Sequence, residues 1–269
     1  MKPLYILKIG GSVVTLKDHP GFSVRKELLD KVADSLLLAR KKGKFDLILI
    51  HGAGALGHSL AKEYGLDKGV GKSARKMHGA LLSRNANQKL DNAICEIFNT
   101  KGLPVAPVHT ASVIIQKNAL ISKFETGMIK EALEKNLIPV MYGDMVFDTK
   151  LGMSVCSGDA IAPFLAKKFG ARKIFFASDI AGVFTNDPHF HKDASLIEEI
   201  SLQEITSNAK LSGSHNVDVT GGLWGKIKKM ESLKKTNVEF VEIFNGLEEG
   251  NYLKALTGKK FPHTKIHIK

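Results

Sequence analysis

Two glycine-rich turns near the start of the chain carry residue types that suit phosphate binding. The first, Lys8-Ile-Gly-Gly-Ser12, follows an apolar run, and the second, His51-Gly-Ala-Gly-Ala-Leu-Gly-His58, follows the apolar run Leu47–Ile50. A glycine turn between a strand and a helix leaves backbone N–H groups aimed at one point, and the helix N-terminus adds positive potential there. Lys8 adds a charge at the first turn, and His58 adds an imidazole donor at the second. We therefore predict that the protein handles two phosphates at once.

Three later segments place glycines and carboxylates at the ends of predicted strands. They are Tyr142-Gly-Asp144, Ser157-Gly-Asp159 and Ser178-Asp179-Ile-Ala-Gly182. Ligands of open α/β sheets bind at the carboxyl ends of strands, and glycines there allow the backbone to come close. Asp159 is suited to orienting lysines, to assisting Mg²⁺ or to capping the helix that follows. For Asp144 alone we favour a simple turn with an Asx cap.

Two further lysines complete the set of candidate phosphate-binding groups. The segment Asp218-Val-Thr-Gly-Gly-Leu-Trp-Gly-Lys226 is another glycine-rich entry to a helix, with Lys226 on its first turn and Thr220 as a candidate cap. Such a lysine projects toward a phosphate. Lys17 lies nine positions after Lys8, so a short turn would fold it back over the same phosphates. Taken alone, Lys17 is more simply a surface lysine.

The composition limits the partners and the compartment. The formal net charge is +12, but the lysines are spread in short pairs, and we expect neither nucleic acid nor a membrane as a partner. Cys95 and Cys156 are the only cysteines and lie in no paired motif, which argues against a disulfide framework or a zinc site. We expect no signal peptide, and no apolar run approaches the length of about 20 residues that a membrane-spanning helix needs. We expect a cytoplasmic protein.

Apolar strands and amphipathic helices alternate along the chain, a pattern that predicts an α/β fold with a mainly parallel sheet. The expected strands are Leu4–Ile9, Leu47–Ile50, Ile138–Tyr142, Lys173–Ala177, Glu239–Phe244 and an edge strand Thr264–Ile268, with a short extended piece at Pro104–Val108 and a small hairpin of Met145–Phe147 with Met153–Val155. The expected helices are Arg25–Lys42, Ser59–Tyr64, Ser73–Lys101, Met128–Lys135, Asp159–Phe169, Leu223–Lys235 and Asn251–Leu256. The segments Gly65–Lys72 and Ser207–Val217 are candidate lid or specificity loops.

Together these motifs resemble the amino acid kinase superfamily and, within it, the isopentenyl phosphate kinases. The resemblance covers nearly the whole chain in order. It rests on Lys8-Ile-Gly-Gly-Ser-Val-Val-Thr-Leu-Lys17, His51-Gly-Ala-Gly-Ala-Leu-Gly-His58, Pro139-Val-Met-Tyr-Gly-Asp-Met-Val-Phe-Asp148, Ser157-Gly-Asp159 and Asp218-Val-Thr-Gly-Gly-Leu-Trp-Gly-Lys226. The turn that ends in His58 distinguishes best between members of the superfamily, because it resembles the matching turn of isopentenyl phosphate kinases and of fosfomycin kinases. The family often has Asp-x-Asp-Gly where this chain has Asp179-Ile-Ala-Gly182, so Ala181 replaces its second acidic residue.

The resemblance implies a single amino acid kinase domain over residues 1–269. Its fold would be a three-layer αβα sandwich around a mostly parallel sheet, with an acceptor-binding lobe at about 1–170 and an ATP-binding lobe at about 171–269. It also implies ATP and Mg²⁺ as cofactors, isopentenyl phosphate as acceptor and a homodimer. No residue is assigned as a dedicated metal ligand.

The resemblance also implies roles for particular residues. The catalytic residues would be Lys8, Lys17, His58, Asp159 and Lys226. ATP would lie against Lys8, Gly10, Gly11, Ser12, Gly54, Asp179, Gly182, Gly222 and Lys226. The acceptor would lie against Ala53, Gly54, His58, Gly143 and Gly158. For its apolar tail we expect a wall formed by the helix that carries Met77, Leu81, Ile94 and Phe98, although the same residues also fit a plain core helix.

Three other functions remain open at this point. The nearest is a kinase of the same fold that acts on fosfomycin or another small alkyl phosphate or phosphonate. The second is a nucleotide-binding sensor without catalysis, which the intact Lys8, Lys17 and Lys226 argue against. The third, a nucleic-acid binder, is suggested by the net charge alone.

Overall fold

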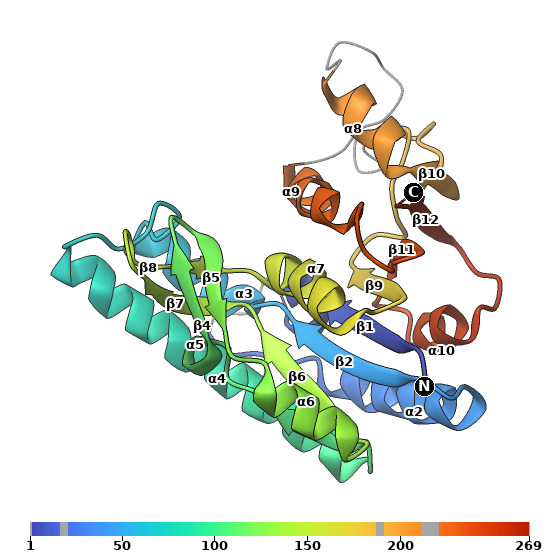
Figure 1. Ribbon diagram of the computed structural model, residues 1–269, viewed down its shortest axis with the longest axis horizontal. Coiled ribbons are helices and arrows are strands. Elements are labelled where there is room, and N and C mark those ends of the chain that lie inside the picture. Colours follow the sequence, from blue (N-terminus) through green and yellow to red (C-terminus); the bar gives the residue numbers. More distant parts are fainter. Residues whose placement is uncertain (1, 17–20, 187–190, 211–220, 269) are drawn as a thin grey trace.

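A large, twisted sheet with helices on both faces organises the molecule (Figure 1). The computed structural model describes residues 2–16, 21–186, 191–210 and 221–268. Within them, eight strands follow the order β10-β12-β11-β9-β1-β2-β6-β3. Their bounds are β1 (Leu4–Ile9), β2 (Asp46–His51), β3 (Val105–Pro107), β6 (Ile138–Tyr142), β9 (Lys173–Ser178), β10 (Glu199–Ser201), β11 (Phe240–Asn245) and β12 (His263–His267). All neighbours are parallel except β11 and β12. The predicted αβα sandwich with a mostly parallel sheet is confirmed.

The last strand of the sheet differs from its prediction. Residues 264–268 alternate between apolar and polar and were expected at an edge, but β12 lies between β10 and β11. The alternation reflects one covered face, since Thr264 and Ile266 are buried while His263, Lys265 and His267 are partly exposed. Alternation of apolar and polar side chains along a strand shows which face of the sheet is covered. It does not show whether the strand lies at an edge of the sheet.

A second sheet stands beside the first in the described part of the chain, with the strand order β5-β4-β7-β8. Its strands are β4 (Ile114–Lys117), β5 (Leu120–Phe124), β7 (Asp144–Asp148) and β8 (Gly152–Cys156). The predicted hairpin is confirmed as β7 with β8, in which Met145 pairs with Val155 and Phe147 with Met153. The strands β4 and β5 were not predicted. The candidate lid at 65–72 is a loop that bonds to this sheet, because the Val70 N–H donates to the Met153 carbonyl at 3.0 Å.

The seven predicted helices are present in the described part of the chain with shifted ends, and three further helices were not predicted. Their bounds are α1 (Gly11–Val14), α2 (Lys26–Lys42), α3 (Gly54–Glu63), α4 (Ala74–Thr100), α5 (Thr110–Val113), α6 (Gly127–Glu134), α7 (Gly158–Phe169), α8 (Leu202–Lys210), α9 (Gly221–Met230) and α10 (Gly250–Thr257), with a 3₁₀ turn at Glu231–Leu233. The main correction concerns α3, which begins at Gly54 inside the glycine turn and not at Ser59. His58 therefore lies within this helix. Residues 207–210 of the second candidate loop, 207–217, belong to α8 instead, and residues 211–217 lie outside the described ranges.

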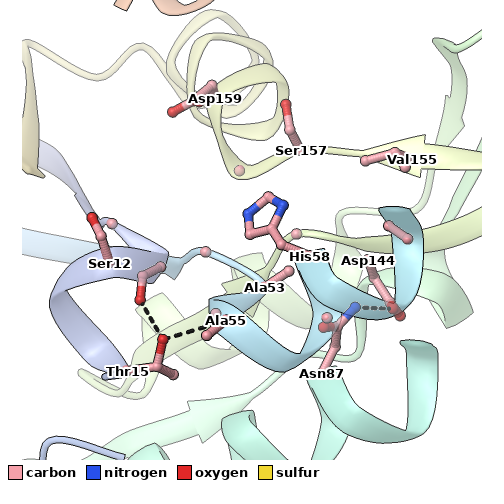
Figure 2. Close-up of a pocket in the computed structure, with 18 of the residues that line it drawn as sticks. Ser12, Thr15, Ala53, Ala55, His58, Asn87, Asp144, Val155, Ser157 and Asp159 are labelled. Carbon is pink, nitrogen blue, oxygen red and sulfur yellow. Dashed lines mark hydrogen bonds between the residues drawn. The ribbon is translucent and has the colours of Figure 1, made fainter. Parts of the chain in front are cut away.

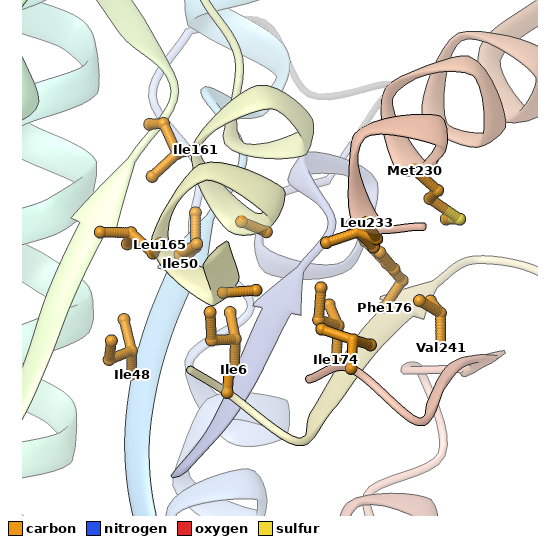
Figure 3. Close-up of a cluster of buried hydrophobic side chains, with 14 of the residues drawn as sticks. Ile6, Ile48, Ile50, Ile161, Leu165, Ile174, Phe176, Met230, Leu233 and Val241 are labelled. Atoms are coloured by element: carbon orange, nitrogen blue, oxygen red, sulfur yellow. The ribbon is translucent and has the colours of Figure 1, made fainter. Parts of the chain in front are cut away.

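The alternation of side chains along β1 divides the core between two faces. Ile6 belongs to the cluster under α7, α8 and α9, which Figure 3 shows with Ile161 and Leu165 of α7 packed over the sheet. Leu7 and Ile9 point to the opposite face, toward α2, α4 and α10. Because side chains two apart share a face, Lys8 lies on the α7 side. The strand therefore presents its last charged side chain to the helix that carries Asp159. No described helix is long and apolar enough to span a membrane.

Asp148, at the end of β7, fastens two turns of the second sheet. Its carboxylate accepts hydrogen bonds from the N–H groups of Asn118 and Ala119, both of which have positive φ. It also accepts from the N–H groups of Lys150 and Leu151 at 2.9 Å. Burial by itself would raise the pKa of this carboxyl, but these donors outweigh burial and hold its pKa well below its ordinary value.

Asp148→Asn should therefore destabilise the protein by about 2–4 kcal/mol at neutral pH, because an amide cannot accept all of these bonds. A folded pKa below the unfolded one means that the stabilisation is present above about pH 4 and is lost as the pH falls through the folded pKa. Denaturant unfolding at several pH values should show the difference shrinking toward low pH. Asp67→Asn, at an exposed position, is the control. A constant difference from pH 7 to pH 3 would contradict the role of the charge.

Candidate active site

One cavity of about 650 Å³ opens where β1, β2 and β9 end, between α3 on one side and α7 on the other (Figure 2). Twelve of the residues predicted for the site line it. They are Lys8, Gly10, Gly11, Ser12, Ala53, Gly54, His58, Gly143, Gly158, Asp159, Asp179 and Lys226. Segments from six parts of the sequence thus meet at the carboxyl edge of the sheet, as expected of a ligand site in this architecture.

The two glycine turns touch each other through their backbones. A Cβ on Gly52 would lie 2.4 Å from the nitrogen of Gly11, and a Cβ on Gly11 would lie 2.9 Å from the nitrogen of Gly54. Thr15 links the turns further, because its hydroxyl donates to the Gly11 carbonyl at 2.8 Å and accepts from the Ala55 N–H at 2.9 Å. The glycines are therefore needed for close approach. Sequence reasoning quoted Thr15 only as part of a motif and gave it no role.

A carboxylate and two lysines form the charged part of the cavity wall. The Nζ of Lys8 lies 3.1 Å from Oδ1 of Asp159, and the Nζ of Lys226 lies 3.9 Å from Oδ2. Burial lowers the pKa of Lys8, and Lys226 acts in the same direction, while Asp159 opposes both. For Asp159 burial would raise the pKa, but Lys8 and Lys226 outweigh it and the pKa is lowered. The predicted convergence of Lys8, Asp159 and Lys226 is therefore present in the fold.

His58 faces this charged group from α3. Figure 2 shows its ring rising from the helix toward Ser157 and Asp159. Burial lowers its pKa below the ordinary value, and the charge of Lys8 lowers it further. Without a ligand the ring is therefore poised as a neutral imidazole that still has one N–H to donate. A bound phosphate would shift its pKa upward, because an anion stabilises the protonated form.

Lys229 is a further cation at the site that the sequence analysis did not identify. Its Nζ donates to the hydroxyl of Ser157 at 2.7 Å, directly before the glycine that opens α7. Its charge also lowers the pKa values of Lys8 and Asp159. Lys229 follows Lys226 by three positions on α9, so the two side chains share a face of the helix. This spacing was the signal available in the sequence.

The predicted wall for an apolar tail is wrong in its residues. The helix α4 does line the cavity, but it does so through Ser83 and Asn87. Ile94 and Phe98 are buried in the core under the sheet. Leu81 is 46% exposed, because it belongs to the outer side of α4. The apolar face of this helix therefore packs on the protein, and a more polar face borders the cavity.

Beside Asn87, the carboxyl of Asp144 completes the far end of the cavity. The Asn87 amide donates to Asp144 at 3.0 Å, as the dashed line in Figure 2 shows. Burial raises the pKa of Asp144 to about 6, although the bond from Asn87 and the charge of Arg84 counteract it. Asp144 is thus more than the turn residue that we favoured from the sequence. Three apolar residues lie near this end, namely Ala61, Met145 and Val155.

The remaining predicted residues fall elsewhere. Gly182 does not line the cavity, and a Cβ there would collide with Thr264, which gives this glycine a packing role. Gly222 lies in the first turn of α9, and its role stays a prediction. Lys17, Asp218 and Thr220 lie outside the described residues, so their roles stay predictions.

The side chains of the described residues do not favour a metal ion that is held by protein ligands alone. Within the described ranges there is no group of three or more His, Cys, Asp or Glu side chains arranged to hold one. Three aspartates line the cavity, namely Asp144, Asp159 and Asp179. Mg²⁺ usually keeps several waters and needs only one or two carboxylates besides the phosphates of a nucleotide. The site therefore fits a Mg²⁺ ion that arrives with a nucleotide.

Comparison with known proteins agrees with this geometry. The model of the amino acid kinase family matches residues 3–245. The isopentenyl phosphate kinase of Methanothermobacter thermautotrophicus is 33% identical over 269 residues, which cover 98% of each chain. That of Methanocaldococcus jannaschii is 33% identical over 262 residues, or 95% of this chain and 96% of the relative. A solved structure of an isopentenyl phosphate kinase superposes with a TM-score of 0.83 at 29% identity, covering 98% of this chain and 99% of the other. The chain belongs to the amino acid kinase family and, within it, to the isopentenyl phosphate kinases.

Proposed function

We propose that the protein transfers the γ-phosphoryl group of ATP to isopentenyl phosphate, giving isopentenyl diphosphate and ADP. The observation that carries this proposal is the meeting of Lys8, His58, Asp159 and Lys226 around a cavity where two glycine turns touch. Two anionic groups must come together in such a reaction despite their repulsion. A site that surrounds one carboxylate with several cations is suited to that task.

The acceptor phosphate would lie on the second glycine turn, near Ala53, Gly54 and His58. One of its oxygens attacks the γ-phosphorus, and the bond from that phosphorus to the bridging oxygen of ADP breaks. A phosphate oxygen is already ionised near neutral pH, since its second pKa is about 6. No general base is required, so the residues of the site contribute alignment and charge neutralisation.

The donor would lie across the first glycine turn, with Lys226 near its β- and γ-phosphates. Lys8, near the end of β1, would then stand between the two anions. Asp159 would orient these two lysines and offset part of their mutual repulsion in the absence of ligand. Mg²⁺ bound to ATP would reduce the negative charge on its phosphates, and Asp159 and Asp179 are the described carboxylates suited to support it. Residues 1–170 would thus mainly bind the acceptor and residues 171–269 mainly ATP.

The tail of the acceptor would lie against Ala61, Met145 and Val155. Beyond them, the hydrogen-bonded pair of Asn87 and Asp144 closes the cavity. The protein is further proposed to be a homodimer, for which the family resemblance is the sole support. Light scattering at several protein concentrations tests that point independently of activity.

The acceptor is tested by measuring ADP release with isopentenyl phosphate, dimethylallyl phosphate, fosfomycin and acetylglutamate. Isopentenyl phosphate should give the highest kcat/KM, and acetylglutamate should fall short by about 10⁴-fold or more, because donors placed for a phosphate remain unpaired against a carboxylate. Equal or faster turnover of fosfomycin would overturn the assignment of the acceptor. An absence of ADP release with every acceptor would favour a nucleotide-binding sensor.

His58→Ala should lower kcat/KM for isopentenyl phosphate by about 10- to 150-fold, the value of 1.5–3 kcal/mol for a hydrogen bond to a charged group. The KM for ATP should change less than about twofold, because the ring serves the acceptor alone. His58→Gln, which keeps an N–H donor, should recover part of the activity. Unchanged steady-state constants in His58→Ala would remove this residue from the site.

Lys226→Met should reduce kcat by about 100- to 1,000-fold, comparable with the loss of one donor to a charged transition state. The matched control is Lys228→Met, since Lys228 is exposed on the same helix. That variant should retain the activity of the original protein. Comparable losses in the two variants would show that α9 as a whole is disturbed and would contradict a specific role for Lys226.

A further inference from the structure

His51 is a buried histidine that none of the roles above uses. It ends β2, directly before the second glycine turn, and only 2% of it is exposed. Its Nδ1 lies 2.8 Å from the carbonyl oxygen of Gly52, and its Nε2 lies 3.2 Å from Oδ1 of Asp91 on α4. His51 itself does not line the cavity. It therefore lies beneath the turn to which we assign the acceptor phosphate.

The partners of the two ring nitrogens determine where the protons are. A carbonyl oxygen only accepts, so the hydrogen bond to Gly52 requires a proton on Nδ1. Asp91 is fully buried, and its Oδ2 has no hydrogen-bond partner among the described residues. Its Oδ1 lies 3.2 Å from Nε2 of His51, and a hydrogen bond between these two atoms requires a second proton between them. Asp91 thus holds one side of the ring and leaves the Nδ1–H to face Gly52.

Because the peptide group between Gly52 and Ala53 is planar, the orientation of the Gly52 carbonyl also determines the direction of the Ala53 N–H. The carbonyl of Gly52 and the N–H of Ala53 belong to the same peptide, which is trans. In a planar trans peptide the C=O and the N–H point in opposite directions. With its carbonyl held toward the His51 ring, the peptide directs the Ala53 N–H away from the ring. Ala53 lines the cavity, and its N–H is one of the donors expected to meet the acceptor phosphate.

His51 also fixes the opposite wall of the acceptor position. Its carbonyl oxygen accepts from the Gly143 N–H at 3.1 Å. Its ring stacks on Tyr142 with a centroid distance of 5.4 Å and an interplanar angle of 18°. The hydroxyl of Tyr142 in turn bonds to Nδ1 of His109 at 3.1 Å. One side chain thus connects the glycine turn, β6 and α4.

We propose that His51, held by Asp91, is a positioning residue that aims the Ala53 N–H at the acceptor phosphate. The proposal rests on the proposed function for the identity of the acceptor, but the orientation of the peptide can be tested with any phosphate. Asp91 acts only through the ring. Neither residue contacts the reacting atoms.

Two substitutions separate the two sides of the ring. The amide of an asparagine at position 51 reaches the place of Nδ1 and keeps the bond to Gly52, whereas that of a glutamine reaches the place of Nε2 and keeps the bond to position 91. Both His51→Asn and His51→Gln are made together with Asp91→Asn, so that neither leaves a buried unpaired carboxylate, and Asp91→Asn alone is the reference.

His51→Gln in this background should raise the KM for isopentenyl phosphate and lower kcat/KM by about tenfold or more, whereas His51→Asn should stay within about threefold of the reference. The KM for ATP should be the same in all three proteins. A purely structural role would lower Tm without this ordering. Equal constants in the two variants, or a larger loss in His51→Asn, would overturn the proposal.

Binding of methyl phosphate, measured by calorimetry without ATP, separates this inference from the proposed function. The Kd for methyl phosphate should be higher in His51→Gln with Asp91→Asn than in Asp91→Asn alone, even if isopentenyl phosphate proves not to be the acceptor. Should the variants fail to fold, ¹⁵N shifts of the histidine rings in the unsubstituted protein decide the matter. A protonated Nδ1 on His51 is expected, and an unprotonated Nδ1 would overturn the proposal.

Discussion

The direct contact between the backbones of Gly11 and Gly52 is the constraint on which the site depends. The strands β1 and β2 are parallel neighbours with Ile9 opposite His51, so the turns that follow them leave the sheet side by side. A Cβ at Gly52 would lie 2.4 Å from the Gly11 nitrogen. Only residues without a Cβ permit this separation. Two groups of backbone donors are thereby brought close enough to serve two phosphates that react with each other.

The charges around these turns favour the binding of anions. They also limit the repulsion between the lysines when no ligand is bound. Among the described residues, Lys8, Lys226 and Lys229 all act electrostatically on Asp159. One carboxylate therefore offsets part of a larger positive charge. Burial lowers the pKa values of Lys8 and His58, and the remaining positive charge lowers them further. Anionic ligands would relieve this repulsion, so that binding energy and charge neutralisation have the same physical origin.

The sequence predicted the parts of the site that local chemistry determines and missed the parts that depend on tertiary packing. Glycines, lysines and carboxylates directly after apolar strands identify the carboxyl edge of a sheet without knowledge of the rest of the fold. The apolar residues of α4 misled the prediction of the tail wall, because residues such as Ile94 report contact with the core and leave the polar Ser83 and Asn87 for the cavity. The strands within 114–124 were missed because a distant residue, Asp148, holds the turn between them.

Asp144 shows how such tertiary packing bears on selectivity. It lines both the main cavity and a smaller one of about 280 Å³ that also contains Arg84 and His109. Among the described lining residues it is the one shared by both cavities, and its carboxyl accepts a hydrogen bond from the amide of Asn87, which lines the larger one. A longer hydrocarbon tail would have to displace a hydrogen-bonded pair and desolvate a carboxyl whose pKa burial has already raised to about 6. With the acceptor tail placed as proposed, Asp144 and Asn87 would therefore favour short acceptors through the cost of uncovering and separating polar groups, in addition to simple steric exclusion.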